Sequence, residues 1–164
     1  MKVTHYPLSS GARAILVAAL IINVIATGLF VSYSQSATAA GTFSDSLWIL
    51  PAVFIGVFVL ILLLLRFRYV LLERYPYLVN LPAFAYRLGI QTDPKRAGIV
   101  INRVFTVHTF ASLYTSALYL VLSTSIIGQN SQFILHSILI LVAIFILTVF
   151  IQYRRIYHSF ANKK

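Results

Sequence analysis

The sequence predicts an all-α integral membrane protein with four transmembrane helices in two antiparallel hairpins. Its 164 residues are 60% hydrophobic with a mean hydropathy of +0.89, which is more apolar side chain than a soluble domain of this size buries. Long apolar runs approach the ~20 residues that cross a bilayer as a helix, and alternating strands typical of a membrane barrel are missing. We therefore expect a single transmembrane domain over residues 1–164, with spans at about 14–33, 47–66, 104–127 and 132–153.

The first run, 14–33, is predicted to anchor the chain. A charged start, an apolar stretch and the small residues of SATAAG, 36–41, resemble a cleaved secretory signal. The apolar core of such a signal has only about 7–15 residues, however, whereas this run is long enough to cross the membrane. Ala19, Asn23 and Thr27 follow at four-residue steps, which places small or hydrogen-bonding side chains on one helix face.

The second and third helices are predicted to extend beyond the membrane and to be joined by a cytoplasmic elbow at residues 75–92. Pro76 ends the second helix, because the residue before a proline disfavours helical geometry. Asp93 and Pro94 suit the N-cap and the first position of the third helix. The elbow is too rich in Tyr, Phe and Leu to remain in water, so we expect it to lie at the lipid headgroups.

The third and fourth runs are predicted to form a hairpin, because only the short turn GQNS, 128–131, joins them. Polar side chains on the third run recur at the spacing of one helix face. One interpretation is packing against another helix, since small hydroxylated residues allow close approach; a polar pathway or ligand groove is the alternative. With the amide expected to join it from the first helix, this polar face consists of Asn23, His108, Ser112, Thr115, Ser116, Tyr119 and Ser123.

The distribution of basic residues predicts the orientation of the chain. All 13 Lys and Arg residues precede the first span, follow the fourth, or lie from the end of the second span to the start of the third. The positive-inside rule therefore places both termini on the cytoplasmic side of a cell membrane. The net charge is +10, and the basic residues form a band at one membrane face. Anionic lipid headgroups, and not nucleic acid, are therefore the expected counterions.

The reactive side chains do not favour catalysis or a bound metal or cofactor. The sequence has no Cys, and its three Asp and Glu residues lie outside the spans. It contains no intramembrane acid–base pair and no HExxH motif. His108 and His136 lie near opposite ends of antiparallel spans, too far apart to share a metal. We predict that the protein is not an enzyme and holds neither a metal nor a cofactor.

The segment YPYLVNLP, 75–82, resembles the SdpI-like family of small multi-helix membrane proteins, which includes a domain of unknown function that precedes the immunity module. Such proteins have a proline, an aromatic residue and Asn-x-Pro after the second span, here Pro76, Tyr77, Asn80 and Pro82. The order of spans, elbow, basic stretch and closing hairpin also agrees. The outer loop, SQSATAAGTFSDS, differs from the Pro-rich, His-containing loop of the family. The resemblance implies an immunity-like or sensor-like function.

Two functions remain open from the sequence. The first is a non-enzymatic membrane protein that acts by association with a protein partner, as an accessory subunit or an immunity- or sensor-like protein, through its basic elbow. The second is a small oligomeric transporter or channel that uses the polar face of the third helix. Expected partners are anionic headgroups on the cytoplasmic side and either a membrane protein or further copies of the chain. The candidate contact residues are Arg74, Pro76, Tyr77, Asn80, Pro82 and Arg87.

Overall fold

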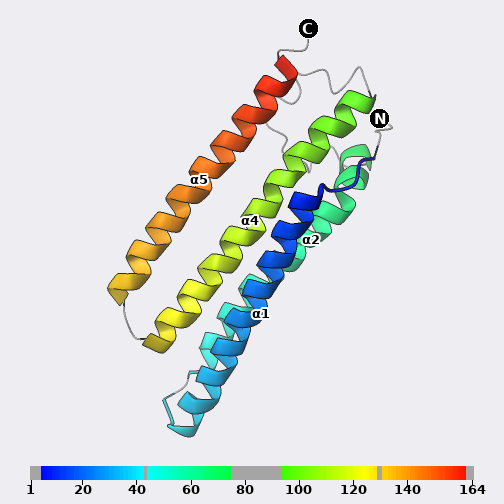
Figure 1. Cartoon of the computed structure of the whole chain (residues 1–164). Coiled ribbons are helices and arrows are strands. Elements are labelled where there is room, and N and C mark those ends of the chain that lie inside the picture. The colour runs from blue at the N-terminus through cyan, green and yellow to red at the C-terminus, as the bar shows by residue number, and fades with distance from the viewer. Residues whose placement is uncertain (1–4, 43, 75–93, 129–130, 162–164) are drawn as a thin grey trace.

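The computed structural model describes residues 5–42, 44–74, 94–128 and 131–161. Within these ranges the regular structure is helical and includes no strand. Four helices are long and apolar enough to cross a membrane, which confirms the predicted all-α multi-pass class. The elements are α1 (Ser10–Ala39), the 3₁₀ helix η1 (Asp45–Trp48), α2 (Ile49–Arg74), α4 (Pro94–Gly128) and α5 (Ser131–Ala161) (Figure 1).

Local sequence explains both ends of α1. The side chain of Ser9 accepts a hydrogen bond from a first-turn backbone N–H at 3.1 Å, as an N-cap does. At the other end Gly41 has a φ of 69°, a conformation that costs glycine little. This turn lets the N–H of Thr42 reach back to the carbonyl of Ala37 at 2.9 Å. The α1 helix therefore ends at a residue pattern that satisfies its last carbonyls.

The long second and third helices begin and end close to the predicted positions. α2 continues to Arg74, and α4 starts at Pro94, where a missing N–H has no consequence. The predicted second span began at residue 47, but η1 comes first and α2 begins only at Ile49. Pro51 consequently lies in the first turn of α2, where it removes no helical hydrogen bond.

α4 is the central helix of the bundle. It packs against α1, α2 and α5, whereas α1 and α2 have few direct contacts with each other. Figure 1 shows α5 on one side of α4 and α1 and α2 on the other, with the start of α1 and the end of α5 at the same end of the bundle. We call this end the basic end, because the exposed side chains of Arg66, Arg74, Arg103 and Arg155 lie toward it.

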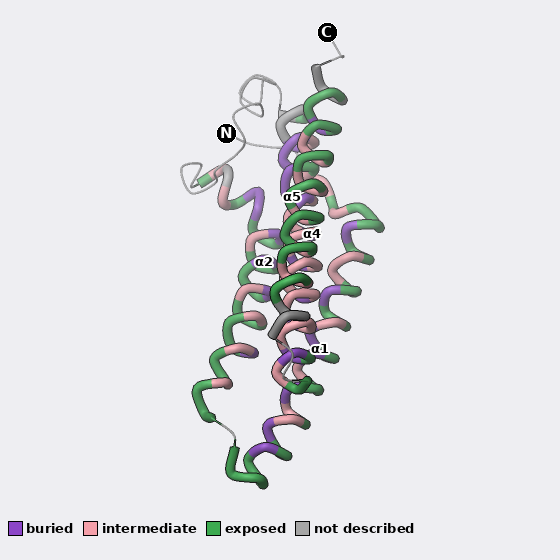
Figure 2. The backbone as a smooth tube through the Cα atoms, turned by 90° about the vertical axis from the view of Figure 1, so that its left-hand side faces the viewer, coloured by how far each residue is buried: buried purple, intermediate pink, exposed green. Residues whose placement is uncertain are grey.

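The contacts of α4 with α2 and with α1 differ in the size of the side chains that they bury. At the basic end, large apolar side chains of α2 and α4 form one cluster, which α5 joins through Ile156. Along α1 the buried positions include Ala12, Ala19 and Ala26, whose small size lets the backbone of α4 approach closely. α5 is exposed along most of its length (Figure 2). Such an apolar exterior is suited to hydrocarbon as its solvent.

Candidate functional site: the polar helix contact and the basic end

The predicted polar face of the third helix lies largely inside the contact between α1 and α4. Asn23 of α1 donates a hydrogen bond from Nδ2 to Oγ of Ser116. One turn further along α1, the hydroxyls of Thr27 and Tyr119 lie 3.2 Å apart. The expectation that the first and third helices touch along these two stripes is confirmed. Four members of the face on α4 are buried: Ser112, Ser116, Tyr119 and Ser123.

The hydroxyl groups of this contact bond mainly to their own helix. Oγ of Ser112 donates to the carbonyl of Thr109 at 2.7 Å, and Oγ of Ser116 donates to the carbonyl of Ser112 at 2.6 Å. At Ser112 and Ser116 the stripe therefore combines small volume with hydroxyls that bond within α4, the composition that lets helices approach in a bilayer. This arrangement favours the packing interpretation over a water-filled path.

The polar groups of His108 and Thr115 lie against carbonyls of α4 itself. Nδ1 of His108 lies 3.4 Å from the carbonyl of Val104 in its own helix, and its ring stacks on Phe105 at 5.2 Å. Thr115 donates to carbonyls of its own helix at 3.0 Å and lines a cavity between α4 and α5. Across the residues that the structure describes, no group of three His, Asp or Glu side chains could hold a metal ion.

Tyr119 connects three helices. Its side chain is fully buried, and its hydroxyl faces Thr27 of α1. Its ring stacks on Phe54 of α2, with centroids 5.1 Å apart and planes within 7° of parallel. A tyrosine on a polar stripe thus provides both a hydrogen bond to one neighbour and ring packing to another.

Sequence reasoning missed a polar network around Arg68 at the basic end. Arg68 is only 8% exposed. Its guanidinium donates to the backbone carbonyls of Leu65 and Tyr6 and, at 3.2 Å, to Oδ1 of Asn102. Asn102 in turn donates from Nδ2 to the carbonyl of Pro7 at 3.1 Å. One arginine therefore ties together α2, α4 and the segment that precedes α1.

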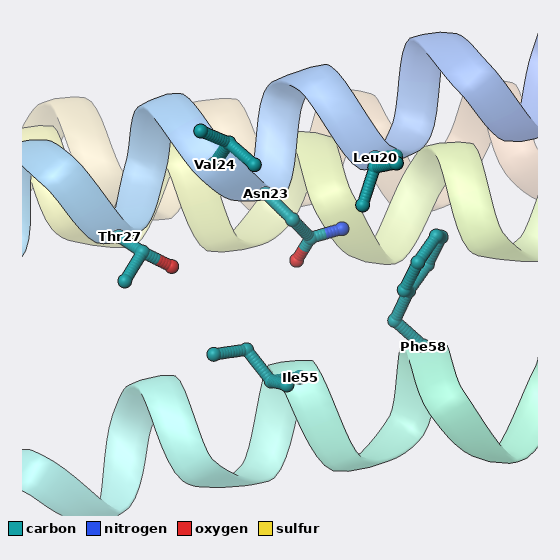
Figure 3. A pocket seen from close by; sticks show the side chains of 6 residues that line it. All are labelled: Leu20, Asn23, Val24, Thr27, Ile55 and Phe58. Carbon is teal, nitrogen blue, oxygen red and sulfur yellow. The ribbon is translucent and has the colours of Figure 1, made fainter.

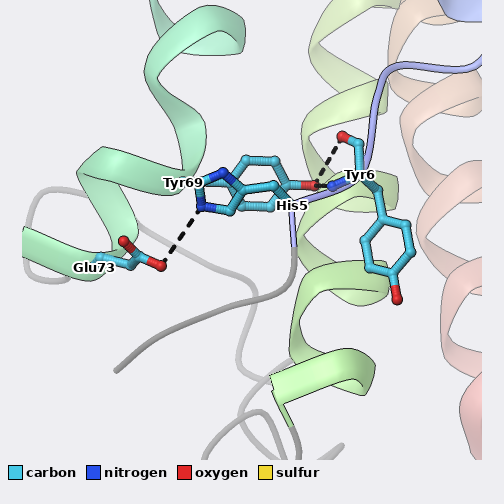
Figure 4. A network of polar contacts seen from close by, with 4 residues as sticks. All are labelled: His5, Tyr6, Tyr69 and Glu73. Atoms are coloured by element: carbon cyan, nitrogen blue, oxygen red, sulfur yellow. Dashed lines mark hydrogen bonds and ion pairs between the residues drawn. The ribbon is translucent and has the colours of Figure 1, made fainter.

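Tyr69 extends this network to the first described residues. Its hydroxyl accepts a hydrogen bond from the N–H of Tyr6 at 2.9 Å and donates to the carbonyl of Tyr6 at 3.1 Å (Figure 4). The ring of His5 stacks on Tyr69 with centroids 4.4 Å apart, and Nε2 of His5 lies 3.6 Å from the carboxylate of Glu73. The sequence signal for this network was weak, because most acceptors are backbone carbonyls, which every residue has.

A cavity of about 390 Å³ lies next to the network, between the start of α1, α4 and α5. Guanidinium groups of Arg103 and Arg155 stand among amide and hydroxyl side chains in its wall, and apolar side chains complete it. This composition suits an anionic group with an apolar attachment, as in a lipid headgroup region. The lining residues are Ser9, Asn102, Arg103, Thr106, Val107, Phe110, Gln152, Arg155 and Ile156.

Of the predicted partner-contact residues, the structure describes Arg74, which is exposed at the last position of α2. Arg74 directly precedes the elbow, and the next helix, α4, begins at Pro94. The remaining candidates lie outside the described residues: Pro76, Tyr77, Asn80, Pro82 and Arg87.

Comparison with known proteins places this bundle in a family with an archaeal member. The chain is similar to an uncharacterized protein of Archaeoglobus fulgidus, with 31% identity over 137 residues that cover 73% of this chain and 72% of the relative. No protein-family model matches the chain, and no solved structure does. The similarity extends over most of both sequences. The chain therefore belongs to the same family as this archaeal protein.

Proposed function

We propose that the protein is a non-enzymatic integral membrane protein that acts by association with a protein partner, as an accessory subunit or an immunity- or sensor-like protein. In this proposal it resides in a cell membrane with both termini cytoplasmic, as the distribution of Lys and Arg favours. Its partner binds at the basic elbow, residues 75–92. The resemblance of this segment to the SdpI-like family supports the immunity- or sensor-like version.

The observation that carries the proposal is the set of contacts between α2 and α4, the two helices that flank the elbow in the sequence. Arg68 of α2 bonds to Asn102 of α4, and both hold the segment before α1. Leu65 and Tyr69 of α2 pack with Ile101 of α4 in the same apolar cluster. Helix ends that are held in place on both sides of a binding segment reduce the entropy that the segment loses on binding, which favours recognition.

The transporter or channel alternative has less support. Ser112 and Ser116 of α4, which would line a path, are buried, and their hydroxyls bond to carbonyls of their own helix. If the alternative held, replacing Ser112, Thr115 and Ser116 by Ala would abolish flux of the transported solute. Under the association proposal these replacements leave partner binding intact.

Site-directed photocrosslinking in the native host tests the association. A photoreactive phenylalanine analogue at Tyr77 should give a discrete adduct with one membrane protein, identified by mass spectrometry. Arg74→Glu combined with Arg87→Glu should abolish this adduct, because the charge just before the elbow and the charge within it are both reversed. Arg154→Glu combined with Arg155→Glu is the matched control, with the same charge change on α5 and an adduct that persists.

Two outcomes would contradict the proposal. Adducts with lipid alone would mean that the elbow lies against headgroups without a protein partner. Equal loss of the adduct in both double variants would mean that the basic band acts through bulk charge, as a lipid-attracting surface does. In either case the elbow would be a membrane anchor and not a docking site.

A further inference from the structure

A crevice separates α1 from α2 in the membrane-spanning part of the bundle. Its volume is about 310 Å³, near the lower end of the ~300–1,000 Å³ typical of small-molecule sites. It exists because α1 and α2 both pack on α4 and have few contacts with each other. Its walls are Leu20, Asn23, Val24 and Thr27 of α1 and Ile55 and Phe58 of α2 (Figure 3).

The crevice lies near the middle of the bilayer. Asn23 follows Arg13, the last charged residue before the first span, by ten positions. At ~1.5 Å per residue this places Asn23 about 15 Å into a hydrocarbon core that is about 30 Å thick. Any molecule that reaches the crevice from the side therefore comes from the lipid phase.

The amide of Asn23 is oriented by its own hydrogen bonds. Nδ2 donates to the carbonyl of Ala19 at 2.9 Å and to Oγ of Ser116. A carbonyl can only accept, so the amide nitrogen must face Ala19, and the assignment of the two amide atoms is determined. Oδ1 then points toward the crevice, on the side of Asn23 that faces Ile55 of α2 (Figure 3).

This oxygen is buried without a donor. Asn23 is 6% exposed, and within the described part of the chain its Oδ1 has no hydrogen-bond partner. A buried acceptor without a donor is costly, most of all in hydrocarbon, where no solvent can substitute. A water molecule is a poor solution, since buried waters usually make about three hydrogen bonds. Apart from Asn23, the crevice wall offers one polar side chain, Thr27, so a water there would lack a third partner.

We propose that the crevice binds an apolar molecule with a hydroxyl group, taken up from the bilayer, whose hydroxyl donates a hydrogen bond to Oδ1 of Asn23. The apolar part of the molecule packs against the four aliphatic and aromatic side chains of the crevice. Thr27 provides a second polar contact at the edge, beside the hydroxyl of Tyr119. This site is separate from the elbow, so it does not depend on the association function.

The test uses the full-length protein in phosphatidylcholine nanodiscs and a C16 alcohol as the probe, with a photoreactive diazirine next to its hydroxyl end. Labelled peptides are mapped by mass spectrometry and should contain residues 20–27 and 55–58. Unlabelled hexadecanol and its methyl ether then compete with the probe. The alcohol should compete about tenfold more strongly, because the ether has the same apolar body but no donor.

Variants distinguish a built site from general lipid contact. Ile55→Trp fills the crevice while the hydrogen bonds of Asn23 to α1 and α4 remain, and it should reduce labelling at least tenfold. Val53→Trp is the matched control, because Val53 is 53% exposed, lies on the same helix and is not part of the crevice wall. Labelling should not change in that variant.

A third variant tests the acceptor itself. Asn23→Leu should abolish the preference for alcohol over ether, whether or not labelling of the crevice persists. Equal competition by alcohol and ether in the natural sequence would overturn the proposal, and so would labelling that Ile55→Trp leaves unchanged. Both results would mean that acyl chains of the surrounding lipids enter the crevice without selection.

Discussion

Replacing Arg68 by Met should release the segment before α1 from the bundle. Met keeps much of the aliphatic stem of Arg68 but removes the donors to the carbonyl of Tyr6 and to Asn102. A hydrogen bond that involves a charged group contributes about 1.5–3 kcal/mol. The carbonyl of Tyr6 keeps its second donor, the hydroxyl of Tyr69. The substitution therefore does not leave this carbonyl without a hydrogen bond, which limits the loss of free energy. We therefore expect docking of the segment to weaken by about 2–3 kcal/mol.

Hydrogen exchange at the amide of Tyr6 measures this effect directly, because that N–H is donated to the hydroxyl of Tyr69. A loss of about 2–3 kcal/mol corresponds to roughly 30- to 140-fold faster exchange through local opening. Arg66→Met is the matched control: Arg66 is exposed and lies two positions earlier on the same helix. Unchanged exchange in Arg68→Met, or equal acceleration in both variants, would refute the clamp that we assign to Arg68.

Further predictions concern the contacts of α4 with its other neighbours. Ala19→Leu should destabilise the bundle by about 1–3 kcal/mol in a denaturing-detergent titration, because Ala19 is fully buried and a larger side chain would separate α1 from α4. Ala18→Leu, at an exposed position, should be neutral. Equal effects of the two variants would contradict the close contact. Tyr114→Phe and Thr148→Val each remove the 3.0 Å hydrogen bond between α4 and α5 and should cost about 0.6–2 kcal/mol. The double variant should cost no more than the larger single effect, whereas Thr124→Val, whose hydroxyl bonds only within α4, should not couple to Tyr114→Phe.

The stripe on α1 was predictable, because the spacing of Ala19, Asn23 and Thr27 is a property of one helix. The same holds for Ser112 and Ser116 on α4, and these two stripes do meet. The assignment of Thr115 to the same face was less accurate. Thr115 and Ser116 lie three and four positions after Ser112, so they are on opposite sides of the helix face that Ser112 defines. The position of the neighbouring helix decides which of the two is buried. Here α1 covers Ser116, and Thr115 turns toward α5.

The network at the basic end could not be predicted from spacing. Arg68 bonds to a backbone carbonyl 62 positions away and to an amide 34 positions away. Arg66 and Arg68 are the same residue type and both follow the apolar run of α2, yet one is exposed and the other is buried. Only the rotation of α2 about its axis distinguishes them, and that rotation is set by packing against α4.

The sequence by itself determined the membrane class, the number of spanning helices, the early start of α4 and the polar stripe that faces α1, because apolar run length, proline position and helical periodicity are local properties. Only the tertiary structure decided that α4 is central, that Arg68 is a clamp and that Asn23 directs a free acceptor into a crevice. These features depend on which helix covers which face. In a bilayer that choice follows from close packing of small residues and a few hydrogen bonds, which hydrophobicity does not encode.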